Sequence, residues 1–439
     1  MGTTHMHPDP APRHGFVPPW LLERIGNDHA ADDAGMRARR SRLSAGFERR
    51  MPVLEGGAAW TVHDAWGTTS LPGTPIRAEG EPEANDVAVN EAAAGISATL
   101  AMFREDFGRS SYDDKGAPVS LTVHYGRDYD NAFWDGQHLV FGDGDGRVFE
   151  RFTKPVDVLA HEFAHAVIEH TAGLVYRSEP GALNESLADV FAACLKQRLL
   201  GQSAAEADWL IGAGLFMPSI GARGLRDMAR PGTAFDDPVL GRDPQVGHMD
   251  DYIVTAEDSG GVHLNSGIPN RAFHLAAVAI GGSSLEGAGR IWYDALAGDG
   301  LGSTATFQDF AALTVARADR HADAVRTAWE QVGVTPDRRD PGSGRSSAPA
   351  PPEVVRVSRS GGFAGMTVTG AVALADCDPR SRELVERLDP EVAQGTPPEP
   401  DRFVYTFEVD GRPPVRVPEQ RMTSELLELA QQVLGTHAR

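Results

Sequence analysis

The sequence predicts an α+β protein with a strand-rich first half, a helical second half and a small α+β module at its C-terminal end. Alternating segments such as 120–125 and 138–144, bounded by turns rich in Gly and Asp, indicate strands in the first half. From Val156 onward, apolar residues recur at helical spacing. The third observation is that 354–439 combines a strand-like alternation with an amphipathic helix.

Changes in composition divide the 439 residues into four parts. Residues 1–50 hold a polar start, the motif PPWLL and a basic stretch, and residues 51–337 form the long globular body. Residues 338–353 are rich in Pro, Ser, Gly and charged residues, which is typical of a linker. The module at 354–439 follows. A chain of this length exceeds one usual domain, so we expect more than one folded unit.

The formal net charge is -21 at pH 7, without a long acidic run. This charge favours solubility and argues against nucleic acid as a partner. The two cysteines, Cys194 and Cys377, cannot form a disulfide framework. The N-terminus lacks the basic start and apolar run of a signal peptide, and no stretch is long enough to span a membrane. We therefore expect no membrane association and a cytoplasmic location by default, with export by a non-classical route as an open alternative.

The motif HEFAH at 161–165 is the strongest chemical signal in the sequence. A helix brings positions i and i+4 to one face, so both imidazoles can bind one metal ion. The surrounding residues contain no proline after Pro155, which favours a helix with Pro155 in its first turn. Glu162 then faces the open coordination position. The alternative is a helix with two surface histidines and a solvated glutamate.

A second helical segment, GALNESLADVF, contains Glu185. Two histidines and a carboxylate from a neighbouring helix form a three-ligand catalytic zinc site that leaves one position for water. Asp189, one turn after Glu185, can accept the free ring N–H of a zinc-bound histidine, and Asn184 can accept the other. An ordinary helix explains each of these residues singly, but it explains them poorly as a set with the HEFAH motif.

The motif DSGGVHLNSG at 258–267 places His263 in what we expect to be a glycine-rich loop. Its glycines would let the backbone approach a substrate closely. Asp258 can orient His263, and a charged His263 can stabilise the oxyanion that forms when water attacks a peptide carbonyl. The alternative is a structural or exposed histidine without a catalytic role.

HEFAHAVIEHTAGLVY, GALNESLAD and GGVHLNSG resemble the motifs of thermolysin-family zinc metallopeptidases, and NAFW at 131–134 resembles the edge-strand motif of that family. The resemblance covers roughly residues 55–335. It implies a two-lobed catalytic domain, with a β-rich N-terminal half, a helical C-terminal half and the cleft between them. It also implies one zinc ion and peptide or protein substrates.

Carried over residue by residue, the resemblance implies that His161, His165 and Glu185 bind zinc. Glu162 would act as the general base, and Tyr176 and His263 would stabilise the oxyanion. It further implies substrate-binding roles for Asn131, Ala132, Arg226, Phe149, Val158, Ile211 and Leu225. The last four would line an apolar pocket, so cleavage before bulky hydrophobic residues is expected. From the residues alone, Arg226 could equally be a surface salt-bridge partner and Tyr176 a core aromatic with one polar end.

Members of this family often bind a pair of calcium ions near the second zinc helix. Asp157 and Asp208 remain acidic at the matching positions, but Lys196, Leu210 and Ala213 offer no side-chain ligand. We therefore expect the calcium pair to be absent, with the ammonium group of Lys196 in place of a cation.

Both ends of the chain resemble regulatory segments. VPPWLLERIG resembles the precursor segment of protealysin-like members, which implies a latent precursor that removes about its first fifty residues by self-cleavage. Residues 354–439, with SGGFAG at 360–365 and a strand containing Tyr405, resemble emfourin, an inhibitor associated with that subgroup. The alternatives are a proline-capped helix that packs permanently on the body, and an accessory or substrate-binding domain.

Two functions remain open at this point. The first is a zinc-dependent neutral endopeptidase made as a latent precursor and restrained by its C-terminal module. The second is a regulatory binding protein that uses a latent zinc-peptidase scaffold. No expected catalytic residue is missing from the sequence, which favours the enzyme.

Overall fold

The structure, a computed structural model, describes residues 15–26, 58–336, 354–361, 368–373, 382, 403–409 and 415–435. The chain forms two compact units, one built almost entirely from the part up to the linker and one containing the C-terminal module. The strands of the main sheet lie in the first half of the first unit and most of its helices in the second half, and the module combines strands with a helix. The predicted α+β class, with a strand-rich first half and a helical second half, is confirmed.

A five-stranded sheet forms the β-rich half, in the order β2-β1-β3-β5-β4. Its strands are β1 (Trp60–Asp64), β2 (Thr74–Ala78), β3 (Val119–Val123), β4 (Ala132–Trp134) and β5 (His138–Phe141). The strands β1, β3 and β5 run parallel, whereas β2 and β4 are antiparallel to their neighbours. Because β4 is an edge strand, its outer backbone groups can pair with another segment.

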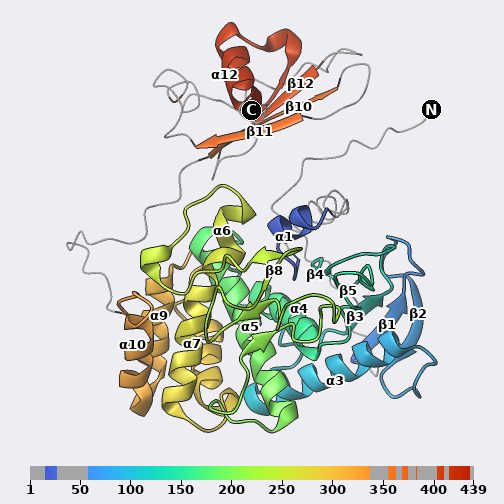
Figure 1. The fold of residues 1–439 in the computed structure, drawn as a ribbon, viewed down its shortest axis with the longest axis vertical. Helices are drawn as coiled ribbons and strands as arrows, with labels where there is room; N and C mark the ends of the chain where they lie inside the picture. Colours follow the sequence, from blue (N-terminus) through green and yellow to red (C-terminus); the bar gives the residue numbers. More distant parts are fainter. Residues whose placement is uncertain are drawn as a thin grey trace. The chain divides into compact units, whose positions relative to one another are not determined.

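Two long helices cross the centre of this unit (Figure 1). Helix α4 (Val156–Glu169) is buried along nearly its whole length, and α5 (Ser178–Leu200) ends at Gly201, whose φ of 63° suits a glycine cap. We expected Pro155 in the first turn of α4. In the structure it is instead the N-cap residue, just before the first turn. Helix α3 (Val87–Phe107) packs against both β1 and α4. Helix α4 thus packs against α5, α3 and the strand β4.

The helical half follows α5. It contains α6 (Asp258–Asn265), α7 (Gly267–Ile280), the π-helix η2 (Leu285–Gly289), α8 (Arg290–Ala297), α9 (Phe307–Arg317) and α10 (Ala322–Glu330). The short 3-10 helix η1 (Met249–Asp251) precedes α6, and η3 (Asp319–His321) lies between α9 and α10. Two small hairpins pair β6 (Leu210–Ile211) with β7 (Arg226–Asp227), and β8 (Asp236–Asp237) with β9 (Gly241–Arg242). Helices α7, α9 and α10 stand side by side at the end away from β1 and β2 (Figure 1).

Helix α6 corrects the expectation for DSGGVHLNSG. His263 lies within this helix and not in a glycine-rich loop. The helix begins with a left-handed stretch, because φ is positive from Asp258 to Gly261. Gly260 and Gly261 adopt this conformation without a Cβ clash, which is their physical role here.

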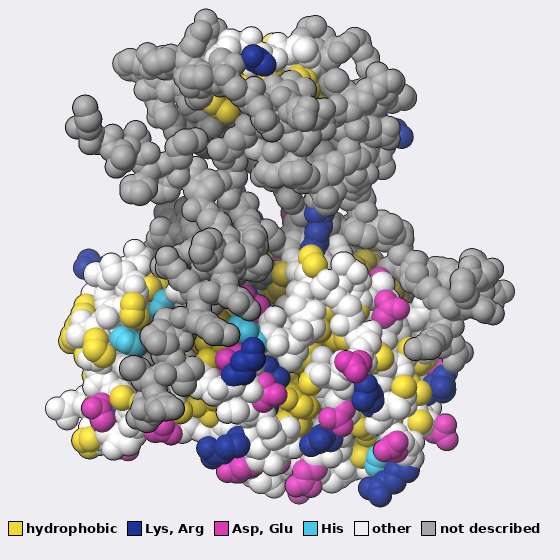
Figure 2. Space-filling view, turned by 180° about the vertical axis from the view of Figure 1, so that it is seen from behind, with side chains coloured by type: hydrophobic (Ala, Val, Ile, Leu, Met, Phe, Trp, Pro, Cys, Tyr) yellow, Lys and Arg dark blue, Asp and Glu magenta, His cyan; other side chains and the backbone are white. Residues whose placement is uncertain are grey.

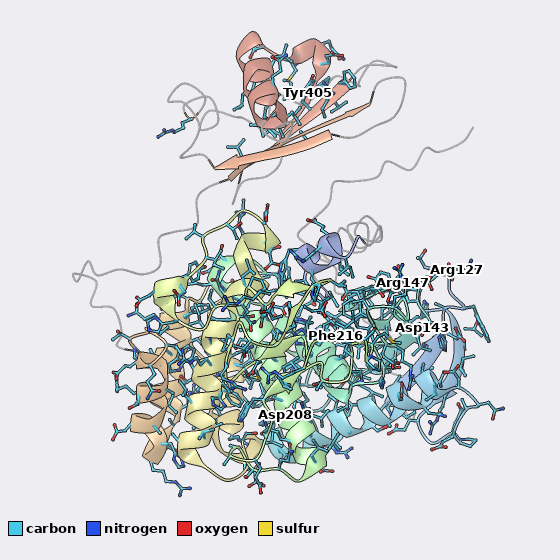
Figure 3. All side chains as sticks on the ribbon, in the orientation of Figure 1. Arg127, Asp143, Arg147, Asp208, Phe216 and Tyr405 are labelled. Carbon is cyan, nitrogen blue, oxygen red and sulfur yellow. The ribbon has the colours of Figure 1, made fainter. Side chains whose placement is uncertain are left out.

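The module has its own hydrophobic core. Strands β10 (Val354–Gly361), β11 (Val368–Ala373), β12 (Phe403–Val409) and β13 (Val415–Pro418) form an antiparallel sheet in the order β11-β10-β12-β13. After the 3-10 helix η6 (Glu419–Arg421), helix α12 (Ser424–Gly435) packs on this sheet. Its core includes Tyr405, labelled in Figure 3, with Val357, Phe407 and Leu429. Most of the SGGFAG motif lies outside the described residues.

Acidic and basic side chains are interspersed over the face of the first unit seen in Figure 2. Among the described helices, none combines the length and the hydropathy that a membrane-spanning segment requires.

His124 links the end of the sheet to the start of α3. Its Nδ1 lies 2.8 Å from Asp143 Oδ2, labelled in Figure 3, and its Nε2 lies 3.2 Å from Asp86 Oδ2. Asp86 is also the N-cap of α3, where it accepts a hydrogen bond from the Val89 N–H. The hydrogen bond to Asp143 outweighs burial and, with the charges of the nearby aspartates, raises the pKa of His124 to about 9.

This pKa predicts a loss of stability in alkali. A histidine whose folded-state pKa is raised from 6.5 to about 9 contributes its full stability below pH 6.5 and loses it as the pH rises through 9. After solvent screening we expect a contribution of about 1 kcal/mol. Urea unfolding at a series of pH values should show this extra loss in the wild type relative to His124→Asn, since asparagine tolerates the positive φ at this position. Parallel pH profiles of the two proteins would contradict the prediction.

Candidate metal centre

Helices α4 and α5 bring three metal-binding side chains together. His161, His165 and Glu185 are buried, and one ligand atom of each lies within 4.8 Å of the others. The two Nε2 atoms are 3.0 Å apart, and the carboxylate of Glu185 lies 3.4 Å from one ring and 3.5 Å from the other. Four ligands placed tetrahedrally 2.0–2.2 Å from a zinc ion would lie roughly 3.3–3.6 Å apart. The spacing therefore fits one zinc ion.

The orientation of the rings supports the same conclusion. His161 Nδ1 lies 2.9 Å from Asp189 Oδ1, and His165 Nδ1 lies 2.8 Å from Asn184 Oδ1. When each Nδ1 donates its proton to these oxygens, each Nε2 carries a lone pair. Two lone pairs and a carboxylate that face one another in a buried space repel unless a cation lies between them. Because both histidines are buried, the alternative of two surface histidines is wrong.

Asp189 joins the metal ligands to two other elements. Arg226, on β7, donates from both Nε and Nη2 to its carboxylate at 2.8 Å. Asn270, on α7, donates to the same carboxylate at 2.8 Å. Burial would raise the pKa of Asp189, but the charges of Arg226 and His161 lower it below its usual range. Arg226 is buried, which excludes the surface salt bridge considered above.

Asn270 has no counterpart among the residues singled out from the sequence. Its only sequence signal is a polar residue within the apolar helix that follows the His263 motif. Gln245 was also missed, although its side chain donates to the His263 carbonyl oxygen at 3.1 Å.

Tyr176 and His263 also contact the carboxylate of Glu185. The Tyr176 hydroxyl donates to Glu185 and lies 3.3 Å from His263 Nε2. His263 Nε2 lies 3.5 Å from Glu185 Oε2. Burial would raise the pKa of Glu185, but the neighbouring histidines, His263 first among them, lower it well below its usual range. Asp258 is buried at the start of the helix that carries His263, and its orienting role stays a prediction.

The N-terminal segment occupies the edge of β4. The Phe16 N–H donates to the Ala132 carbonyl oxygen at 3.0 Å. The Val17 N–H donates to Asn131 Oδ1 at 2.8 Å, and Asn131 Nδ2 donates back to the Val17 carbonyl oxygen at 3.3 Å. Asn131 and Ala132, expected to pair with a substrate backbone, therefore pair with the chain itself.

The side chain of Phe16 is fully buried beside the metal ligands. Its ring meets the His161 ring edge-on, with 5.1 Å between the centroids, and its carbonyl oxygen accepts a hydrogen bond from Arg226 at 3.1 Å. The Phe16 ring also lies close to Gly212 and Leu225, since a Cβ added to Gly212 would lie 3.3 Å from both that ring and Leu225. The four expected pocket residues are buried in the same core as Phe16: Phe149, Val158, Ile211 and Leu225.

Known proteins match this chain over most of its length. The thermolysin metallopeptidase catalytic domain matches residues 54–169, and the thermolysin metallopeptidase alpha-helical domain matches residues 172–334. An extracellular metalloprotease of Pectobacterium carotovorum subsp. carotovorum is 49% identical over 332 residues, which cover 72% of this chain and 95% of that protein. The chain belongs to the thermolysin metallopeptidase family. It is thus a zinc-dependent metalloendopeptidase.

Further comparisons place this thermolysin-family chain in a subgroup. A solved structure described as the precursor of protealysin, a metalloproteinase from Serratia proteamaculans, is 46% identical, with a TM-score of 0.66. The match covers 73% of this chain and all of that one. Emfourin matches residues 357–434. The resemblance to protealysin-like peptidases with an emfourin-like module is confirmed.

The expected cytoplasmic location is contradicted by the relatives of this thermolysin-family chain. Besides the Pectobacterium protein, an extracellular minor metalloprotease of Serratia marcescens is 45% identical over 196 residues, which cover 44% of this chain and 55% of that protein. Both names state an extracellular protein. The expectation was wrong because it rested on the composition of the first residues alone, which does not decide where a protein acts.

Proposed function

We propose that this peptidase is a neutral endopeptidase that cleaves protein substrates before bulky hydrophobic residues and is made as a latent precursor. The observation that carries the proposal is Phe16. Its side chain fills the space beside the metal ligands, and its backbone pairs with Ala132 and Arg226. A substrate with a bulky residue after the scissile bond can make the same contacts once the segment has left. The extracellular names of the relatives support action outside the cell.

The proposed roles follow from the geometry. His161, His165 and Glu185 would hold a zinc ion, which supplies Lewis-acid activation of water and of the scissile carbonyl. Glu162, next to His161 on α4 and buried, would take a proton from the attacking water and return it to the leaving amine.

The remaining groups hold the reacting bond. Tyr176 and His263 would donate to the oxyanion, and Arg226 would bind the next carbonyl of the substrate. Asp189 would keep both His161 and Arg226 in place, because it accepts hydrogen bonds from each.

The precursor is expected to be latent for two reasons. The segment at 15–17 occupies the groups that would bind a substrate, and the emfourin-like module at 354–439 is proposed to inhibit the cleft. A tethered inhibitor has an effective concentration of roughly millimolar, so modest affinity suffices. Self-removal of about the first fifty residues, near Phe47 and Met51, lies outside the described residues and stays a prediction.

Removing residues 1–50 and 338–439 should therefore increase casein hydrolysis at least about tenfold over the full chain, because the tether no longer holds either occupant near the cleft. Single removals separate the two contributions. Titrating the separate 354–439 module into residues 51–337 should lower the hydrolysis of a small peptide again. If it has no effect at high concentration, the module is an accessory domain. If no version hydrolyses casein, the regulatory binding protein is the better explanation.

Lys196 stands at one of the positions where the resemblance to the family leads us to expect calcium ligands. Its Nζ lies 2.7 Å from Asp208 Oδ1, labelled in Figure 3, and 2.7 Å from the Leu210 carbonyl oxygen. The buried Asp157 lies 4.0 Å from the same ammonium group. Burial raises the pKa of Asp157 to about 6, and Lys196 opposes that rise. We propose that Lys196 replaces calcium in this chain.

Calcium should therefore change the melting temperature little, whether it is added or chelated. Lys196→Met should lower the free energy of unfolding by about 2 kcal/mol, because Asp157 and the Leu210 carbonyl lose their cation. Lys154→Met is a matched control, since Lys154 forms only a partly exposed ion pair with Glu150, and we expect less than about 1 kcal/mol. A large rise in melting temperature with calcium would count against the replacement.

A further inference from the structure

We propose that this chain hydrolyses its own Gly15–Phe16 bond, so that the N-terminal segment is a substrate as well as an occupant of the site. The inference rests on the proposed peptidase function. One water molecule is consumed: the bond between the Gly15 carbonyl carbon and the Phe16 nitrogen breaks, leaving a carboxylate on Gly15 and an ammonium group on Phe16.

The hydrogen bonds on β4 set the register of the segment. Phe16 donates to Ala132 at 3.0 Å, and Val17 exchanges hydrogen bonds of 2.8 and 3.3 Å with the Asn131 side chain. One hydrogen bond to the backbone of Ala132 and two to the Asn131 side chain hold this register, because a slip by one residue would break all three and turn each side chain to the opposite side. The segment therefore presents one particular bond to the catalytic groups.

That bond is the one between Gly15 and Phe16. The Gly15 carbonyl oxygen lies 3.2 Å from His263 Nε2, and the Tyr176 hydroxyl lies 3.3 Å from the same nitrogen. These are the two groups proposed to hold the oxyanion. On the other side, the Phe16 carbonyl accepts from Arg226, and the Phe16 ring fills the pocket beside His161. The bond thus lies between a contact to His263 on its carbonyl side and the contacts of Phe16 to Arg226 and His161 on the other.

Glycine before the bond leaves the Asn131 side chain in place. A Cβ at position 15 would lie 2.5 Å from Asn131 Nδ2, so any other residue would push that side chain away. Asn131 holds Val17 through both of its amide atoms, and displacing it would also loosen the register.

The cut would not by itself open the site. Residues after Phe16 stay anchored, because Val17, Leu21 and Leu22 are buried and α1 (Pro19–Arg24) carries the last two. The Trp20 ring also stacks on Phe235 at a centroid distance of 6.5 Å. Hydrolysis would release residues 1–15 and leave a chain that starts at Phe16 and remains latent until a later cut.

The test uses the full chain loaded with zinc. Mass spectrometry should detect the fragment 1–15 and a new N-terminus at Phe16, at a rate independent of protein concentration. Glu162→Gln should abolish the fragment, Phe16→Asp should lower its rate at least about a hundredfold and Gly15→Val roughly tenfold or more. Glu23→Gln, an exposed change on α1, should leave the rate unchanged.

A second readout does not depend on activity. In the Glu162→Gln chain, the amide hydrogens of Phe16 and Val17 should exchange about a hundredfold more slowly than in a Phe16→Asp/Glu162→Gln chain. Equal exchange in the two proteins would overturn the register, and so would a fragment that ends elsewhere. If the chain starting at Met51 hydrolyses casein but no fragment 1–15 forms in the full chain, the inference fails and the proposed function stands. If neither reaction occurs, the proposed function fails.

Discussion

Replacing Glu162 by Gln should lower the hydrolysis of casein by about three orders of magnitude and leave one zinc ion bound per chain. Glu162 is buried beside His161 but does not belong to the group of three side chains that can hold the metal. Glutamine keeps the shape of the side chain and cannot accept the proton of the attacking water. Metal analysis and initial rates measure the two effects separately.

Both proteins should start at Met51 in this comparison, since a variant without activity cannot remove its own N-terminal segment. Glu185→Gln is the matched control: it makes the same chemical change at a residue that contributes a ligand atom, so zinc should be lost together with activity. Substantial turnover in the Glu162→Gln protein would refute the role of general base.

Replacing Asp189 by Asn should destabilise the protein by about 3–5 kcal/mol, because Arg226 would remain buried without its counter-charge. The same change should weaken zinc binding by about 10- to 100-fold, since the His161 ring loses its carboxylate partner. Urea unfolding and competition with a zinc chelator measure these effects. A Glu162→Gln background prevents self-digestion during both experiments.

Two further variants separate charge from hydrogen bonding at Asp189. Asn270→Ala removes a neutral donor from the same carboxylate and should cost about 1 kcal/mol. Combining Asp189→Asn with Arg226→Met should recover part of the stability but none of the zinc affinity, because the uncompensated charge is gone and His161 still lacks its partner. An unchanged urea midpoint in Asp189→Asn would show that Arg226 finds another anion.

The zinc ligands were predictable because their geometry is local. Positions 161 and 165 meet on one face of any helix, and Glu185 lies on the next helical pattern along the chain. Asp189 lies one turn after that ligand on the same helix and Asn184 directly precedes it, so both are close to the metal ligands. The division into a strand-rich half, a helical half and a module likewise follows from patterns that repeat within a few residues.

The residues that escaped prediction belong to contacts between distant parts of the chain. Asn270 reaches Asp189 from α7, and Gln245 reaches the backbone of His263, without a local pattern that links either pair. His263 was expected in a loop because its glycines disguise a helix that begins with a left-handed turn.

The sequence by itself determined the candidate metal ligands, the strand-rich first half and helical second half, and the presence of a C-terminal module, because helical spacing and composition act over short stretches. Only the tertiary structure decided that Phe16 fills the pocket and that Gly15 faces His263. A motif such as PPWLL predicts that a segment resembles a precursor, but not where its backbone lies. That register depends on hydrogen bonds to Asn131 and Ala132, more than a hundred residues away, which form only when the edge strand β4 is in place.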